Sequence, residues 1–99
     1  MKPNLKKLLP GRILFEEFLK PVNISAYRLA KETYIEPKRI SEIIHGKRSI
    51  TADTALRLSR FFGNSPEYWM NLQNRFDLES KKDSISKELK AIKSVKELV

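Results

Sequence analysis

The residues best suited to recognising a ligand stand at the start of one predicted helix, in the stretch EPKRISEIIHGKRS (residues 36–49). Isoleucines at positions 40, 43 and 44 fit one helical face, and Pro37 suits the first turn. Lys38 and Arg39 then fall at the amino end, where the helix dipole is positive and cations are unfavourable. Because both cations are expected to do nothing for the helix itself, they indicate an anionic ligand.

The face of this helix opposite the isoleucines carries side chains that form hydrogen bonds. With a turn of about 100° per residue, Lys38, Glu42 and His45 point away from the isoleucines, flanked by Arg39 and Ser41. In duplex DNA, lysine and arginine bond guanine edges, and glutamate accepts a hydrogen bond from cytosine. A solvated face with ordinary charges is the alternative interpretation.

A second predicted helix lies immediately before this one. Ser25 suits its N-cap, and the helix extends to about Glu32, so only residues 33–36 join the two helices. That spacing is typical of a helix-turn-helix, whose second helix enters the DNA major groove amino end first. The Lys38–Arg39 pair is therefore predicted to meet DNA.

The rest of the chain also predicts helices, so the expected fold class is all-α. Helices are expected over about 10–19, from a cap at Thr51 to a left-handed residue at Gly63, and from a cap at Ser65 onward. The polar stretch ESKKDS (79–84) resembles a linker or a helix break. We therefore divide the chain into a basic segment at 1–9, a five-helix domain at 10–79 and a C-terminal amphipathic helix at 80–99.

The C-terminal helix is predicted from an apolar stripe. Ile85, Leu89, Ile92 and Val99 recur at spacings of 4, 3 and 7, as on one face of a helix of about 14 residues. A helix of that length is marginal alone, so its stripe must be buried to stabilise it. Packing on its own domain, dimerisation, docking on another protein and fraying in solution are the alternatives.

Composition narrows the functional classes. The 99 residues include 20 Lys and Arg against 12 Asp and Glu, and this net charge of +8 favours a polyanionic partner. No cysteine is present, and a single histidine argues against a metal cluster or a catalytic histidine system. Phosphate-loop and nucleophile-elbow motifs are missing, as is any membrane-spanning apolar run. We expect a cytoplasmic protein without enzymatic activity, cofactor, metal or membrane partner.

Two further clusters have ordinary interpretations that we prefer. Trp69 beside Tyr68 could stack on a ligand, but a core position for Trp69 is the favoured interpretation. Glu16 and Glu17 could be paired catalytic carboxylates, but adjacent helical residues diverge by about 100°. We expect them to form a solvated face that touches a basic partner.

The stretch from PGRILFEEFLKP through SPEYWMNLQNRFDLE, residues 10–79, resembles the HigA-type antitoxins, also called virulence-associated protein I. These belong to the phage-repressor-like (XRE/Cro-type) helix-turn-helix group. The segments RISEIIHGKRSITADTALRLSRFFG and SPEYWMNLQ carry the resemblance. It implies a five-helix phage-repressor-like DNA-binding domain, a homodimer that binds double-stranded operator DNA to repress its own operon, and a partner toxin, a RelE-like ribonuclease.

The resemblance also assigns roles to residues. It implies base contacts from Pro37, Lys38, Arg39 and Glu42, of which Pro37 offers only apolar contact. Tyr34 departs from the motif, which favours glycine at the tight turn, and a tyrosine with a positive φ there would be uncommon and strained, so the geometry of the turn stays open. The implied phosphate contacts are Ser25, Tyr27, Arg28, His45, Lys47 and Arg48. The expected dimer interface follows Gly63 and comprises Tyr68, Trp69, Leu72, Phe76 and Leu78.

Two other functions remain as alternatives. A stand-alone XRE-type regulator without a toxin would have the same fold. A small RNA-binding protein or ribonuclease is argued against by the single histidine and the helical pattern. Because acidic residues are scarce, the surface of this chain is better suited to binding DNA than to binding a basic ribonuclease toxin.

Overall fold

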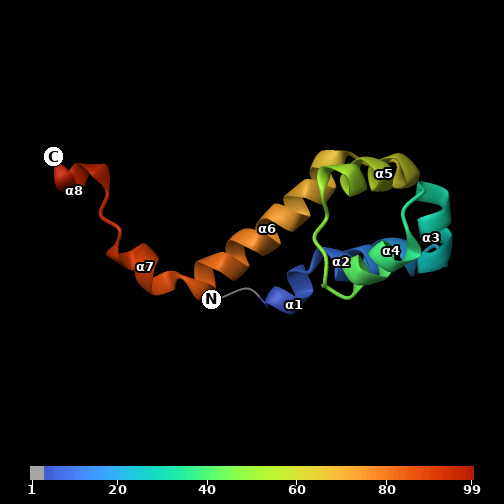
Figure 1. Ribbon diagram of the computed structural model, residues 1–99, viewed down its shortest axis with the longest axis horizontal. Helices are drawn as coiled ribbons and strands as arrows, with labels where there is room; N and C mark the ends of the chain where they lie inside the picture. The colour runs from blue at the N-terminus through green and yellow to red at the C-terminus, as the bar shows by residue number, and fades with distance from the viewer. Residues whose placement is uncertain (1–3) are drawn as a thin grey trace.

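The computed structural model describes residues 4–99, in which every regular element is a helix (Figure 1). The all-α prediction is confirmed for this part of the chain. The elements in order are α1 (Leu5–Leu8), α2 (Pro10–Ile13), its π-helical continuation η1 (Leu14–Leu19), α3 (Ala26–Thr33), α4 (Pro37–Ile44), α5 (Ala52–Phe62), α6 (Pro66–Ser84), α7 (Ser86–Ala91) and α8 (Val95–Leu98).

The starts of three helices follow from capping side chains. The hydroxyl oxygens of Ser25, Thr51 and Ser65 each accept the backbone N–H three residues later, at 3.0, 3.4 and 3.1 Å. Such caps satisfy one of the amide groups that the first turn leaves without a partner. Gly63 ends α5 with a φ of 76°, the left-handed conformation that glycine adopts at low cost. All four predicted boundaries are confirmed.

The core lies among α2, η1, α3, α4, α5 and the first part of α6. Trp69 is fully buried there, with its ring centroid 4.7 Å from that of Phe18, and its Nε1 donates to Asn64 Oδ1 at 2.9 Å. The preferred core interpretation of Trp69 is confirmed. Because its side chain has no exposed surface to offer a second copy, the prediction that places Trp69 in a dimer interface is wrong. The buried apolar residues are Leu14, Leu19, Leu29, Ala30, Ile35, Ile40, Ile43, Ile50, Ala55, Leu58 and Trp69.

Gly11 lies where α2 crosses the carboxyl end of α4. It is buried, and a Cβ atom added to it would overlap the carbonyl oxygen of Ile43 and lie 2.8 Å from Cα of Ile44. The two helix backbones therefore approach as closely as a residue without a side chain allows. This contact fixes the distance of α4 from the N-terminal half of the domain.

The predicted break at residues 79–84 is wrong, because α6 continues through Ser84. Glutamate and lysine are good helix formers on an exposed face, and α1 packs against α6. Of the predicted N-terminal segment 1–9, residues 1–3 lie outside the described part of the chain. The division at residue 79 stays a prediction, although no helix end marks it.

The single C-terminal helix is also wrong. Residues 92–94 separate α7 from α8, and both lie beyond the helical body at the far end of α6 (Figure 1). The radius of gyration is 16.7 Å, whereas a compact chain of this length has about 13 Å. Most of the apolar stripe does not pack on its own domain, since Leu89, Ile92 and Val99 are exposed, whereas Ile85 at the end of α6 is half-buried.

Candidate nucleic-acid interface

The helix-turn-helix consists of α3, a short turn and α4. Ile40 and Ile43 bury the inner face of α4, and α3 packs against it. Tyr34 occupies the turn with a φ of 57° and a ψ of 35°, so this tyrosine does adopt the left-handed conformation that favours glycine. Its side chain is 88% exposed. The turn conformation therefore does not depend on packing of the tyrosine ring.

The outward face of α4 begins with Pro37 and Lys38, both exposed. Within residues 4–99, the Lys38 ammonium has no hydrogen bond or ion pair. It stands beside the positive end of its helix with nothing in the described chain to balance it. Lys38 thus matches the expectation for a cation that contributes nothing to its own helix.

Arg39 behaves differently, because its guanidinium bonds to a neighbouring helix. Its Nη2 donates to the hydroxyls of Thr54 at 3.0 Å and Thr51 at 3.2 Å, and lies 3.6 Å from Asp53 Oδ1. Its buried Nε has no partner among the described residues. The arginine therefore ties the first turn of α4 to the N-terminus of α5, with only part of the guanidinium left accessible.

Two of the predicted DNA-contacting residues bind each other. Arg48 Nη2 lies 3.1 Å from Glu42 Oε1, and Arg48 Nε donates to the same oxygen at 3.2 Å. A carboxylate held this way is not free to read a cytosine unless the pair opens. Glu42 is therefore positioned to orient Arg48. The sequence did not predict this contact, because the two residues are six positions apart and the end of α4 lies between them.

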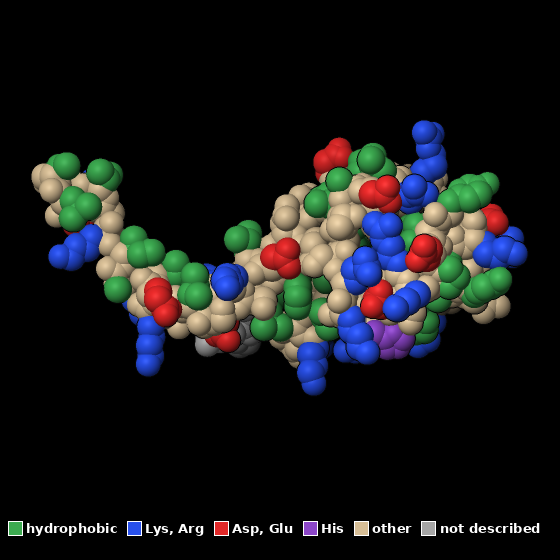
Figure 2. All heavy atoms as spheres, in the orientation of Figure 1, with side chains coloured by type: hydrophobic (Ala, Val, Ile, Leu, Met, Phe, Trp, Pro, Cys, Tyr) green, Lys and Arg blue, Asp and Glu red, His purple; other side chains and the backbone are tan. Residues whose placement is uncertain are grey.

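A polar hollow of about 430 Å³ between α4 and α5 brings most of these groups together. Its charged lining combines four cations with three carboxylates, and the carboxylates of Asp53 and Glu42 are occupied by arginines. Figure 2 shows Lys, Arg and the single histidine gathered over the α3–α5 end of the molecule. The charged lining residues are Lys38, Arg39, Arg48, Arg57, Glu36, Glu42 and Asp53.

The predicted phosphate contacts lie at two places beside α4. Ser25, Tyr27 and Arg28 are exposed at the start of α3, where the Ser25 hydroxyl is already the helix cap. His45 follows α4, and its Nδ1 donates to the Ser41 carbonyl oxygen at 2.7 Å, because a carbonyl oxygen only accepts. That bond turns Nε2 away from the helix. Lys47 and Arg48 continue the loop as exposed cations.

The predicted dimer residues on α6 are accessible to different degrees. Leu78 is 70% exposed and Tyr68 37%, whereas Leu72 and Phe76 are half-buried. Burial and the nearby carboxylate of Glu17 raise the pKa of the Tyr68 phenol above its usual value. This stretch of α6 thus offers a mixed apolar and polar surface.

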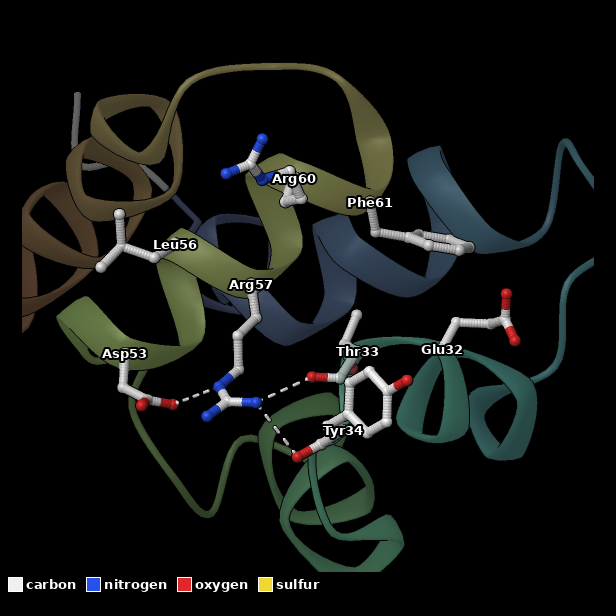
Figure 3. A pocket seen from close by; sticks show the side chains of 8 residues that line it. All are labelled: Glu32, Thr33, Tyr34, Asp53, Leu56, Arg57, Arg60 and Phe61. Carbon is white, nitrogen blue, oxygen red and sulfur yellow. Dashed lines mark hydrogen bonds and ion pairs between the residues drawn. The ribbon is translucent and has the colours of Figure 1, made fainter.

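Arg57 is a residue of this region that the sequence did not reveal. From α5 its Nη1 donates to the carbonyl oxygens of Thr33 at 3.0 Å and Tyr34 at 3.2 Å, and its Nε donates to Asp53 Oδ1 at 2.9 Å (Figure 3). The contact with Thr33 spans 24 positions in sequence. No local pattern predicts it.

Within residues 4–99, no helix combines the length and the apolarity that a bilayer crossing requires.

Comparison with known proteins agrees with this geometry. A helix-turn-helix family profile matches residues 15–69. Virulence-associated protein I of Dichelobacter nodosus is 48% identical over 88 residues, which cover 86% of this chain and 82% of that protein. A HigA-family addiction module antidote protein from Coxiella burnetii is 41% identical with a TM-score of 0.83, covering 95% and 98% of the two chains. Pseudomonas aeruginosa antitoxin HigA, solved with the higBA promoter, is 34% identical with a TM-score of 0.81, covering 86% and 92%.

Proposed function

Because this chain belongs to the XRE-type helix-turn-helix family that includes the HigA antitoxins and virulence-associated protein I, we propose that it binds operator DNA, represses its own operon and acts as an antitoxin. One observation carries the proposal most directly. Lys38 stands exposed and unpaired within the described chain at the amino end of α4, where only an external anion balances it.

In the proposed complex, α4 lies in the major groove with Lys38 directed at base edges, most favourably guanine. The loop at residues 45–48 and the start of α3 flank this helix and contact phosphates on either side. Glu42 holds Arg48 for one of these contacts, across their 3.1 Å ion pair. Base contacts then give the sequence preference, and phosphate contacts give the register.

Gel-shift titration tests the DNA-binding part of this proposal. The probes are a duplex covering the region upstream of the protein's own reading frame and a shuffled duplex of equal length and composition, at one fixed salt concentration. Saturable binding with a preference of at least roughly a thousandfold for the upstream duplex is expected. Equal affinity for both probes would contradict sequence-specific repression.

The loop cation Lys47 gives a prediction about salt. It is exposed and unpaired within residues 4–99, so Lys47→Ala should remove one phosphate contact without disturbing the fold. Affinity for all duplexes should fall by a similar factor, and the slope of log affinity against log salt should decrease by about one unit. A changed base preference at one operator position would instead assign Lys47 to the groove.

Neutralisation of a RelE-like ribonuclease is the remaining part of the proposal, and the antitoxin names of the relatives support it. The exposed carboxylates of Glu16 and Glu17 on η1 are the acidic side chains that a basic toxin would contact, although Glu16 already pairs with Lys20 at 3.4 Å. Co-expression with the product of the adjacent reading frame should yield a complex that lacks ribonuclease activity. If no neighbouring product binds, the protein is a stand-alone regulator.

Assembly gives a further prediction. A homodimer would place two α4 helices about 34 Å apart on one face of the duplex, and we propose that the exposed face of α6 forms its interface. Two chains of 11.6 kDa should then sediment as one species of 2 × 11.6 = 23.2 kDa. Leu78→Glu should give a monomer with weakened operator binding, because Leu78 is 70% exposed in the single chain.

The matched control for this variant is Leu56→Glu on α5. Leu56 is 60% exposed and lies outside the proposed interface, so its substitution should leave the sedimentation unchanged. If Leu56→Glu dissociated the dimer while Leu78→Glu did not, the interface would lie on α5.

A further inference from the structure

We propose that Arg57 is a positioning residue for DNA recognition, which locks the turn before α4 and thereby aims Lys38. The proposal rests on the DNA binding proposed above and extends it to a residue on α5. Arg57 reaches from α5 to the turn, and its guanidinium joins three acceptors on two different elements (Figure 3).

The turn needs such a lock because its backbone is strained. Tyr34 adopts a left-handed conformation with a φ of 57°, which disfavours residues other than glycine. The ring does not hold it there, since the side chain is 88% exposed. Local backbone bonds supply part of the constraint, including Ile35 N–H to the Ala30 carbonyl oxygen at 3.0 Å.

Arg57 supplies the tertiary part of the constraint. Its Nη1 binds the last carbonyl of α3, at Thr33, and the carbonyl of the left-handed Tyr34 itself. A cation is also favoured at the negative carboxyl end of α3. The direction in which the chain leaves the turn sets the direction of α4, which begins at Pro37.

Asp53 connects this lock to the first turn of α4. Its Oδ1 accepts from Arg57 Nε at 2.9 Å and lies 3.6 Å from Arg39 Nη2. Two arginines that share one carboxylate oxygen thus hold both the turn and the start of α4 against α5. Lys38, the neighbour of Arg39, is positioned by this arrangement without taking part in it.

Arg57→Lys is the decisive substitution, with Arg60→Met as its control. Lysine keeps the charge, but one ammonium cannot reproduce the planar fork that reaches the two carbonyls and Asp53 together. Arg60 is exposed on the same helix, lines together with Arg57 the hollow drawn in Figure 3, and has no hydrogen bond or ion pair among residues 4–99. The Arg60→Met variant therefore shows how much DNA affinity changes when a nearby positive charge is lost and no contact is broken.

Affinities for the upstream duplex and the shuffled duplex should be measured where thermal melts show each variant fully folded. Arg57→Lys should lower the affinity for the upstream duplex by about tenfold while changing that for the shuffled duplex less than about twofold, because base contacts depend on aim and phosphate contacts much less. Arg60→Met should leave the ratio of the two affinities unchanged. An unchanged ratio in Arg57→Lys, or an equal loss on both duplexes with a smaller salt slope, would overturn the proposal.

A second measurement does not depend on DNA. Amide hydrogen exchange at Ile35 should be faster in Arg57→Lys than in the wild type and unchanged in Arg60→Met, because the lock holds that turn closed. Adding Tyr34→Gly to Arg57→Lys should restore part of the preference for the upstream duplex over the shuffled one. Glycine adopts the left-handed turn conformation without needing contacts from Arg57. Unchanged exchange would overturn the lock itself, whereas a wild type without preference for the upstream duplex would overturn only the proposed function.

Discussion

Gly11→Ala should destabilise the protein by at least about 3 kcal/mol, at or beyond the upper end of ordinary overpacking effects. The added Cβ would overlap the Ile43 carbonyl oxygen, and its neighbour would be the backbone of Ile44, so no flexible side chain can move aside. Helix propensity alone predicts the opposite sign, since alanine is favoured over glycine by about 1 kcal/mol in a helix. The sign of the change therefore separates packing from propensity.

Thermal unfolding measures this effect, and the Tm should fall by more than about 10 °C in a domain of this size. Gly63→Ala is the control. It has no atom within 4 Å of the added Cβ but a φ of 76°, so it should lose only about 1–2 kcal/mol through backbone strain. If Gly11→Ala raised the Tm, α2 and α4 would not approach as closely as the structure shows.

Local signals predicted the elements of the DNA-binding unit well. Capping hydroxyls, Pro37 in a first turn and Gly63 at a helix end act within a few residues of themselves, so sequence alone reveals them. The predicted linker or helix break at 79–84 was wrong because lysine and glutamate suit an exposed helix as well as a linker. The prediction of a single C-terminal helix was wrong because a short amphipathic helix is marginal unless its apolar face is buried against another surface.

Contacts between distant residues account for what the sequence did not reveal. Arg39 was interpreted from its place in α4, yet its hydrogen bonds are with Thr51 and Thr54, 12 and 15 positions away. Arg57 binds a carbonyl 24 positions away. Gly11 is visible in the sequence, but the backbone that it abuts is not. Such partners depend on how helices cross, which no periodicity determines.

Lys38→Glu should abolish operator binding while leaving the protein as stable as the wild type or slightly more stable. The lysine has no partner among residues 4–99, so its removal breaks nothing in the described fold. A carboxylate near the positive amino end of α4 should instead stabilise the helix by roughly 0.3–1 kcal/mol. Placed against the groove and its phosphates, the same carboxylate should weaken operator binding by a hundredfold or more, on the order of several kcal/mol of like-charge repulsion.

Thermal melts and gel-shift titration at fixed salt measure both effects, with Lys93→Glu as the matched control. Lys93 lies between α7 and α8, far from α4, and is exposed (Figure 1), so its substitution makes the same change in net charge. If long-range charge alone governed binding, the two variants would lose affinity equally. Arg39→Glu should differ from both, because it breaks the hydrogen bonds to Thr51 and Thr54 and must lower the Tm as well. Unchanged operator affinity in Lys38→Glu would mean that α4 is not the recognition helix.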